Sequence, residues 1–384
     1  MTAQSPVDMD HGPTHEADRG PAMPSVEYNT IAPASRTLWM VLLAGAALVG
    51  AGITALIGWN IALWVIISLV LFLVAVYVGY RVTSGHRQGL DQVVRTLIYT
   101  AFALAVIPLV WLLWSVFSNA IPPLLENPHV LTDDMYAVSG GVDEDRVEEG
   151  ASLVGGMKHA LIGTVVITLI ASIISIPIGL MAAIYLVEYG TNGWFSKTLR
   201  FLVDVMTGVP SIVAGLFAYA LFSMLFGPGT KIGMAGAIAL CVLMIPIVVR
   251  NSEEMLRVVS RDLRESALAL GVPKWRVITK IVLPTAAAGL ASSVFLGVAR
   301  VIGETAPLLV AAGYNAATNW NPFEGPMNSL AFYAYQLFQY PLNPGYPNPS
   351  LERSWIAVFL LVVLVLVLNL VARAVAAALA PKRS

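Results

Sequence analysis

Long apolar blocks dominate this 384-residue chain, and polar residues are largely confined to the segments between them. A helix needs about 20 apolar residues to cross the hydrocarbon layer of a membrane. Eight blocks have a comparable length: 37–57, 60–80, 97–119, 159–187, 203–226, 233–250, 286–312 and 355–378. The pattern therefore predicts an all-α, polytopic membrane protein with about eight transmembrane helices. Pro177 and Pro307 lie inside the two longest blocks and permit a bend in each.

The composition supports this class and excludes several others. Hydrophobic residues make up 57% of the chain and charged residues 12%, about half the charged share of a soluble protein. The net charge of −1 gives no basis for a nucleic-acid partner. The single cysteine, Cys241, excludes a disulfide within the chain and a thiolate metal site. His11 and His15 are four residues apart, but the Pro- and Gly-containing segment around them fixes no metal geometry, so we expect no metal and no cofactor.

Lysine and arginine are distributed unevenly over the segments between the predicted spans. If the N-terminus is cytoplasmic, 17 of the 22 basic residues lie on the inner side, 4 lie on the outer side, and Arg300 lies within a span. Basic residues concentrate on the cytoplasmic side of membrane proteins. We therefore expect both termini to be cytoplasmic, with residues 1–36 forming a disordered tail.

Two outer segments are long enough to have a structure of their own. Residues 120–157 contain eight acidic residues, which suit either a docking surface for an extracytoplasmic partner or, more simply, a solvated loop. Residues 327–340 are aromatic and apolar enough to pack on the membrane face of the protein.

The inner segment 251–284 predicts two helices joined by an elbow. Residues 252–270 suit a helix, Gly271 supplies its stop, and Pro273 begins a second short helix that ends at Pro284. Two pairs with a spacing of four, Glu253 with Arg257 and Arg261 with Glu265, can form ion pairs on the first helix. On composition alone, this segment also suits an amphipathic helix on the membrane surface.

The same segment resembles the EAA loop of ABC importer permeases. That pattern is Glu-Ala-Ala, three residues, Gly, nine residues, Ile, one residue and Leu-Pro. It is matched here by Glu265, Ser266, Ala267, Gly271, Ile281, Leu283 and Pro284, with Ser266 in place of alanine as the one departure. The resemblance implies a cytoplasmic coupling helix in which Glu265, Ser266, Ala267 and Gly271 contact a separate ATPase subunit. No GxxxxGK[ST] motif occurs in the chain, so we expect a transport subunit without enzymatic activity of its own.

Four further segments, 179–189, 207–219, 246–259 and 299–309, resemble phosphate-importer permeases of the PstA type over roughly residues 97–380. This resemblance implies a type I ABC importer core at 97–384, a multi-pass location in a bacterial cytoplasmic membrane and import of inorganic phosphate by alternating access. It also implies a heterodimer with a PstC-like permease, two copies of a PstB-like ATPase and a PstS-like phosphate-binding protein. The hairpin at 37–96 lies outside the resemblance, as an addition to the core.

Arg300 and Glu304 are the candidate residues of the substrate path. They are four residues apart in one predicted span, where buried charges usually face a partner or a water-filled path. One interpretation is a structural ion pair; the other is that Arg300 binds the oxyanion while Glu304 holds it and limits its affinity. Arg250 lies near the inner end of span six, where it would either meet the anion or anchor the helix. Small residues at 208, 211 and 215 suit helix packing or pore lining equally well.

Three alternatives remain at this point. The loop motif also suits an ABC importer for molybdate, sulfate or phosphonate. An ion-coupled secondary transporter would normally show inverted repeats, and we find none. A membrane-embedded enzyme would need a nucleophile–base or acid cluster within the spans, which the sequence does not offer.

Overall fold

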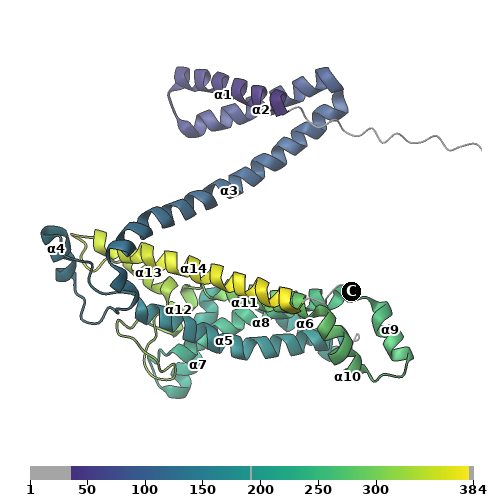
Figure 1. Cartoon of the computed structure of the whole chain (residues 1–384), viewed down its shortest axis with the longest axis vertical. Helices are drawn as coiled ribbons and strands as arrows, with labels where there is room; N and C mark the ends of the chain where they lie inside the picture. The colour runs from purple at the N-terminus through teal and green to yellow at the C-terminus, as the bar shows by residue number, and fades with distance from the viewer. Residues whose placement is uncertain (1–35, 191–192, 380–384) are drawn as a thin grey trace, which may run out of the picture. The chain divides into compact units, whose positions relative to one another are not determined.

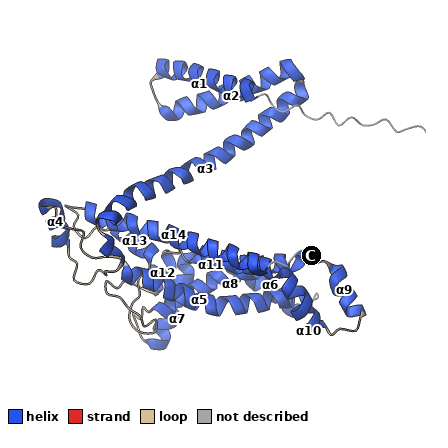
Figure 2. Ribbon diagram, in the orientation of Figure 1, coloured by secondary structure: helices blue, strands red, loops and turns tan. Residues whose placement is uncertain are grey.

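The computed structural model describes residues 36–190 and 193–379, and every regular element in these ranges is helical (Figures 1 and 2). Seven of the described helices are long and apolar enough to cross a membrane, and a sharply bent pair makes an eighth if it is counted as one span. The predicted all-helical class with seven to eight spans is therefore confirmed. The predicted tail at 1–36, with His11 and His15, lies outside the described residues except for Arg36.

The chain divides into two compact units, residues 1–108 and 109–384. In the first unit, α1 (Arg36–Ile57) and α2 (Ile61–Ser84) form a hairpin, with Asn60 capping the start of α2 through its side chain. Phe72, Val76 and Tyr80 on α2 are buried together with Ala46 on α1. Gly50 lets the two backbones approach, since a Cβ at this position would collide with Ser68.

The third helix, α3 (His86–Glu126), is longer than the sequence pattern predicts. Residues 81–96 lie between two predicted spans, but in the structure only Gly85 interrupts the helices there, with a positive φ of 93°. Polar residues such as Gln92 and Thr96 therefore lie on a continuous helix, where both side chains are buried. The proposed boundary between an added hairpin and the core at 96/97 falls inside α3, and that division stays a prediction.

The core of the second unit is a bundle of α5 (Lys158–Ile184), α8 (Gly233–Val258), α11 (Leu283–Val301) and α14 (Asn348–Leu379). Small residues allow the close approach of these helices: a Cβ at Gly179 or Gly297 would press on Val248. Leu240, Met244 and Val248 on α8 are fully buried in the resulting cluster. Neighbouring helices therefore cover α8 on most sides and leave little of its apolar surface exposed.

The predicted fifth span, 203–226, is wrong as a single straight helix. The structure has α6 (Trp194–Thr207) and α7 (Ser211–Phe226), which meet at an angle of 107°. The break falls at Gly208, Val209 and Pro210. Proline has no N–H to continue a helix, and it disfavours the helical conformation in the residue before it.

The predicted seventh span, 286–312, is likewise broken. Helix α11 ends at Val301, and a short helix α12 (Ala306–Ala311) follows after Ile302, Gly303, Glu304 and Thr305. Pro307 lies in the first turn of α12, where its missing N–H is no loss. The break places Glu304 in a non-helical connection instead of on the face of a continuous helix.

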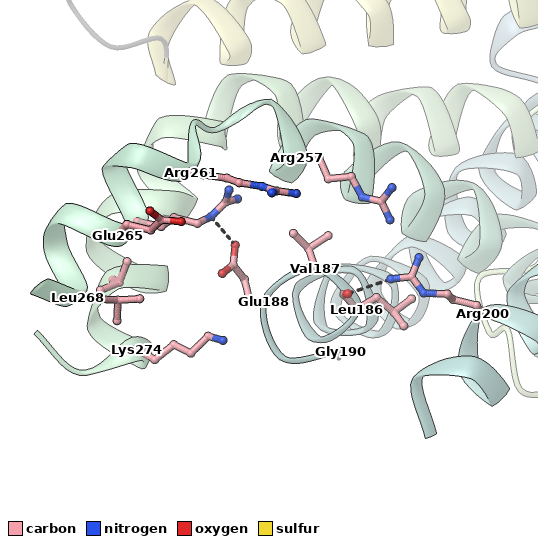
Figure 3. Close-up of a pocket in the computed structure, with 12 residues that line it drawn as sticks. Leu186, Val187, Glu188, Gly190, Arg200, Arg257, Arg261, Glu265, Leu268 and Lys274 are labelled. Carbon is pink, nitrogen blue, oxygen red and sulfur yellow. Dashed lines mark hydrogen bonds and ion pairs between the residues drawn. The ribbon is translucent and has the colours of Figure 1, made fainter. Parts of the chain in front are cut away.

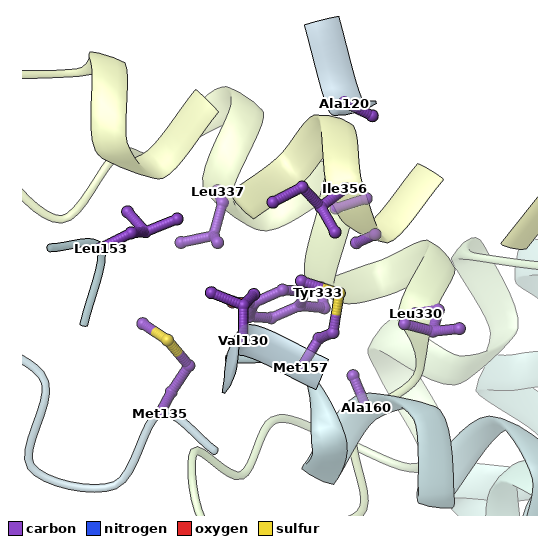
Figure 4. Close-up of a cluster of buried hydrophobic side chains, with 12 residues drawn as sticks. Ala120, Val130, Met135, Leu153, Met157, Ala160, Leu330, Tyr333, Leu337 and Ile356 are labelled. Atoms are coloured by element: carbon purple, nitrogen blue, oxygen red, sulfur yellow. The ribbon is translucent and has the colours of Figure 1, made fainter. Parts of the chain in front are cut away.

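Residues 127–157 and 313–354 form a packed cap at one end of the bundle. The cap contains a 3-10 turn (Pro128–Leu131), α4 (Gly140–Glu149) and α13 (Leu330–Gln339). Tyr333 of α13 is fully buried among Val130, Met157 and Ile356 (Figure 4). The predicted packing of 327–340 against the protein is thus present, although the segment is mostly buried rather than spread on the surface.

Candidate functional site: a mid-span cavity and a coupling loop

A cavity of about 370 Å³ lies where the two broken spans meet α8. Its walls come from the α6–α7 bend, from α8 and from the end of α11, and the lining residues are Met206, Thr207, Val209, Pro210, Ser211, Leu243, Pro246, Ile247, Arg300 and Glu304. The structure therefore brings together two predictions that were separate in the sequence: the charged pair and the Gly-Val-Pro-Ser segment. Ser211 lines this cavity, whereas Gly208 and Gly215 do not.

Arg300 and Glu304 form an ion pair at the wall of this cavity. The Glu304 side chain is only 10% exposed, whereas that of Arg300 is 60% exposed. A guanidinium carries five N–H donors, and the pair with Glu304 uses one of them. Arg300 therefore presents unused donors to the cavity, while Glu304 is held against the protein.

The position of Glu304 depends on how α12 packs. Gly215 on α7 touches the backbone of Pro307, where a Cβ would come within 2.6 Å of the Pro307 Cα. Gly236 on α8 has a similar close contact with Ala312 and Leu308. These two glycines fix α12 against α7 and α8, and thereby fix the connection that carries Glu304. Gly215 serves helix packing, which is one of the two roles its sequence context suits.

Arg250 does not line the cavity but forms an ion pair with Asp204 of α6. Arg250 lies one helical turn beyond Pro246 and Ile247, and Asp204 lies three residues before Thr207. The pair therefore flanks the cavity on the side toward the end of α8. Sequence reasoning missed Asp204, although an acidic residue within a predicted span was itself the available signal.

The coupling loop is shorter than the sequence predicts and is continuous with a span. Residues 252–258 belong to α8, and the first loop helix, α9, covers only Arg261–Ala269. Gly271 follows with a φ of 77°, a conformation that residues with a Cβ resist. The second helix does not end at Pro284: α10 (Lys274–Val277) continues through a π-helical turn (Ile278–Val282) into α11. The wider π-helical turn directly precedes Pro284, whose ring would clash in a regular helix interior.

The four motif residues occupy distinct positions in this loop. Glu265 and Ser266 are exposed, Ala267 is buried, and Gly271 forms the exposed elbow. Ala267 packs with Leu256 and Val277, so it ties α9 to the neighbouring helices. Glu265 and Ser266 remain exposed and are accessible to another protein.

Arg264 anchors α9 to the bundle and was not singled out in the sequence. It pairs with Glu188 at 3.0 Å and donates to the carbonyls of Leu256 and Val259. Of the two ion pairs predicted on this loop, Glu253–Arg257 is present at 2.8 Å. The described side chains of Arg261 and Glu265 form no such pair, although both lie on α9 four residues apart.

A groove of about 580 Å³ runs between the loop and the ends of α5 and α6 (Figure 3). Five basic residues line it: Arg200, Arg257, Arg261, Arg264 and Lys274. The carboxylates of Glu188 and Glu265 also lie on its wall. The groove is thus strongly polar and adjoins the elbow at Gly271.

Comparison with known proteins places this chain in a family. Residues 175–384 match the family described as "Binding-protein-dependent transport system inner membrane component". The chain is 41% identical to "Phosphate transport system permease protein PstA 1" of Mycobacterium tuberculosis (strain CDC 1551 / Oshkosh) over 286 residues, which cover 74% of this chain and 88% of that protein. It is 35% identical to "Phosphate transport system permease protein PstA" of Pasteurella multocida (strain Pm70), over 71% of this chain and 91% of that protein.

Among solved structures, a chain of a bacterial alginate ABC transporter in complex with a pentasaccharide-bound periplasmic protein superimposes with a TM-score of 0.48 and 13% identity. The match covers 73% of this chain and 94% of that chain, and the family assignment does not depend on it. The family match over residues 175–384 covers the broken spans, the mid-span cavity and the coupling loop. The chain belongs to the binding-protein-dependent transport system inner membrane component family, as a multi-pass permease subunit whose ATPase is a separate protein.

Proposed function

We propose that this chain is the permease subunit of an ATP-driven importer of inorganic phosphate. The observation that carries this proposal is the half-open ion pair in the mid-span cavity, where Arg300 keeps unused donors facing the cavity. Relatives at 35–41% identity are phosphate transport system permease proteins by name, which supports phosphate as the substrate.

In this proposal, each charged residue has a role in transport. The planar fork of Arg300 suits bidentate binding of a phosphate oxyanion. Glu304 holds Arg300 at the wall and competes for its charge, so that the anion is bound without being trapped. Arg250, paired with Asp204, provides a second cation that the anion meets as it leaves toward the inner end.

The coupling loop is the proposed contact with the ATPase. Glu265 and Ser266 are exposed for this contact, and Gly271 sets the elbow between the two loop helices. The assembly would contain two copies of a PstB-like ATPase, a PstC-like permease and a PstS-like binding protein. The exposed acidic residues of α4, which are Glu144, Asp145, Glu148 and Glu149, are the surface that we propose the binding protein approaches.

The proposed sidedness follows the basic residues, with both termini and the coupling loop in the cytoplasm. A reporter fused after Ser384 should be active on the cytoplasmic side, and one inserted near Asp145 should be active on the outer side. Activity of the C-terminal reporter on the outer side would contradict the proposed sidedness and would place the coupling loop outside the cytoplasm.

The test of function is phosphate uptake by an assembled complex that carries Arg300→Gln. Glutamine keeps much of the side-chain length but loses the charge, and charge-assisted hydrogen bonds contribute about 1.5–3 kcal/mol, so uptake should fall roughly tenfold or more. Arg87→Gln is a matched control, because Arg87 lies on α3, outside both the cavity lining and the coupling loop. Normal uptake in the Arg300 variant would reject Arg300 as a substrate-binding residue.

The same assay separates phosphate from the competing oxyanions. Unlabelled phosphate should suppress the uptake of labelled phosphate, while equal concentrations of sulfate, molybdate or phosphonate should not. If the complex transports sulfate or molybdate but not phosphate, the proposed substrate is wrong, and the importer class is retained.

A further inference from the structure

The groove beside the coupling loop holds more positive charge than its own carboxylates neutralise. Five basic side chains line it, against the two lining carboxylates of Glu188 and Glu265. Even when the buried Glu253 is included, two positive charges remain. This excess lies in a hollow of about 580 Å³ rather than on an open convex surface.

The carboxylates lie in the wall, and the guanidinium groups lie in front of them. Glu253 is 5% exposed, whereas Arg257, its partner at 2.8 Å, is 56% exposed. Glu188 is also buried and pairs with Arg264. An anion that enters beside Arg257 therefore meets an exposed cation, and the buried carboxylates keep Arg257 and Arg264 in place. Glu265 is the exposed carboxylate of the groove.

Unused hydrogen-bond donors remain on both sides of the groove. Arg264 already uses its three nitrogens on Glu188 and two carbonyls. Arg257 uses only one nitrogen, on Glu253, and Arg261 forms no ion pair with any described carboxylate. Figure 3 shows Arg257 and Arg261 along one side of the groove and Lys274 on the other, with Val187 and the Glu188 carboxylate, which is paired with Arg264, between them.

We infer that this groove binds an oxyanion of the phosphate class, held by the unused donors of Arg257 and Arg261, with Lys274 on the opposite wall of the groove. Guanidinium and ammonium groups are the side chains that bind phosphate oxygens most strongly. A bound anion would link α9 and α10 across the Gly271 elbow and stiffen the coupling loop. The anion is either free phosphate or the phosphate of an anionic lipid headgroup. This site is separate from the mid-span cavity. Only the effect of the bound anion on transport depends on the proposed function.

The experiment is hydrogen–deuterium exchange of the full-length chain in dodecyl maltoside and phosphate-free buffer. Addition of inorganic phosphate should slow exchange in peptides that cover α9, α10 and residues 185–190. Arg261→Gln should weaken the apparent affinity about tenfold, because a hydrogen bond to a charged group contributes roughly 1.5–3 kcal/mol. Lys274→Gln, from the opposite side, should have a similar effect. Arg276→Gln, on the same short helix but over the Trp275 ring, should leave protection unchanged.

A second arm distinguishes the two sources of the anion. Protection by vesicles that contain phosphatidylglycerol, with none by inorganic phosphate, would assign the site to a lipid headgroup and still support an anion site. Protection by neither probe, or protection that persists in both Arg261→Gln and Lys274→Gln, would overturn the inference.

The Arg300→Gln variant separates the groove from the mid-span cavity. Protection of the loop peptides should persist in this variant, because Arg300 does not line the groove. Loss of this protection in Arg300→Gln would show that the anion acts through the mid-span cavity. That result would overturn the proposal of a separate site in the groove. A failed uptake prediction for Arg300→Gln would leave the local exchange result unaffected, so the two proposals fail independently.

Discussion

Two arginine–carboxylate ion pairs in the second unit have the same chemistry but differ in solvent exposure and in their hydrogen bonds. In the cap, Arg353 and Asp143 are 1% and 0% exposed, and they pair at 2.7 Å. In the mid-span cavity, Arg300 pairs with Glu304 but remains 60% exposed. Both side chains of the cap pair are buried, whereas in the cavity pair only Glu304 is buried and Arg300 is exposed. A buried charge alone therefore does not identify a functional site.

Hydrogen-bond saturation explains this difference. Arg353 donates to both oxygens of Asp143 and, through two nitrogens, to the Val154 carbonyl, while Ser350 donates to the same carboxylate. Arg300 has a single partner in the described structure. A saturated pair stabilises the fold, whereas a pair with spare donors beside a cavity has the capacity to bind an anion.

The largest expected effect is that of Arg353→Gln. It leaves Asp143 fully buried without its cation, and breaking a buried pair costs about 3–5 kcal/mol. We expect a large loss of folded protein in the membrane, measured by the yield of monodisperse protein in detergent. The double variant Arg353→Met with Asp143→Leu removes both charges and should recover much of that yield. Normal yield of Arg353→Gln would show that the cap tolerates an uncompensated buried charge.

The sequence predicted the cavity pair but not the cap pair, for a simple geometric reason. Arg300 and Glu304 are four residues apart and were visible as charges in an apolar block. Asp143 and Arg353 are 210 residues apart, and each lies in a polar segment, where a charged residue is common and gives no signal of a special role. Their pairing depends on the packing of α4 against the start of α14, which local pattern does not encode.

The helical class and the motif were predictable because they depend on local sequence. Runs of apolar residues give the spans, and Gly271 with Pro273 gives the elbow. The break at 208–210 was missed because hydropathy counts apolar residues and does not respond to backbone direction. Pro210 was the available signal, since proline interrupts helices. The bend that Pro307 permits in the seventh span was expected, and the structure has a full break there at 302–305. The groove was not predictable, because it joins residues from the π-helical turn Tyr185–Tyr189 that follows α5 and from α6, α8, α9 and α10.

The second prediction tests whether Glu304 limits the affinity of the open pair. In Glu304→Gln, Arg300 keeps its charge but loses its counter-ion, so it should hold the anion more tightly. We expect both the apparent KM for phosphate and the maximal uptake rate to fall, the rate by roughly tenfold, with normal assembly. Glu304→Asp keeps the negative charge and should retain more of the rate. A raised KM would contradict the role of Glu304 and favour a purely structural pair.

The third prediction concerns the coupling loop, where the backbone rather than a charge is constrained. Gly271 has a φ of 77°, and a Cβ there would meet no neighbouring atom within 4 Å. Gly271→Leu therefore introduces conformational strain of about 1–2 kcal/mol without a clash. We expect the protein to remain in the membrane while less ATPase co-purifies with it. Gly271→Asn is the matched control, because asparagine tolerates this conformation. Undiminished co-purification of the ATPase with Gly271→Leu, together with normal uptake, would separate the elbow from coupling.

The smallest effect is expected for a third arginine–carboxylate pair, Arg146 with Glu352. It lies in the cap, close in sequence to the buried pair: Arg146 follows Asp143 by three residues on α4, and Glu352 precedes Arg353 on α14. The two side chains meet at 2.8 Å, as closely as the buried pair does, but both retain contact with solvent. Water competes for such charges, and pairs of this kind contribute about 0–1 kcal/mol. Arg146 also keeps its hydrogen bond to the Ala151 carbonyl when its partner changes. Glu352→Gln should therefore leave the yield and the thermal transition of the detergent-solubilised protein close to those of the parent chain. Because the cap and the pair chemistry are shared with Arg353–Asp143, the two variants differ mainly in burial. A loss for Glu352→Gln as severe as that for Arg353→Gln would mean that the position in the cap, rather than burial and saturation, determines what an ion pair contributes here.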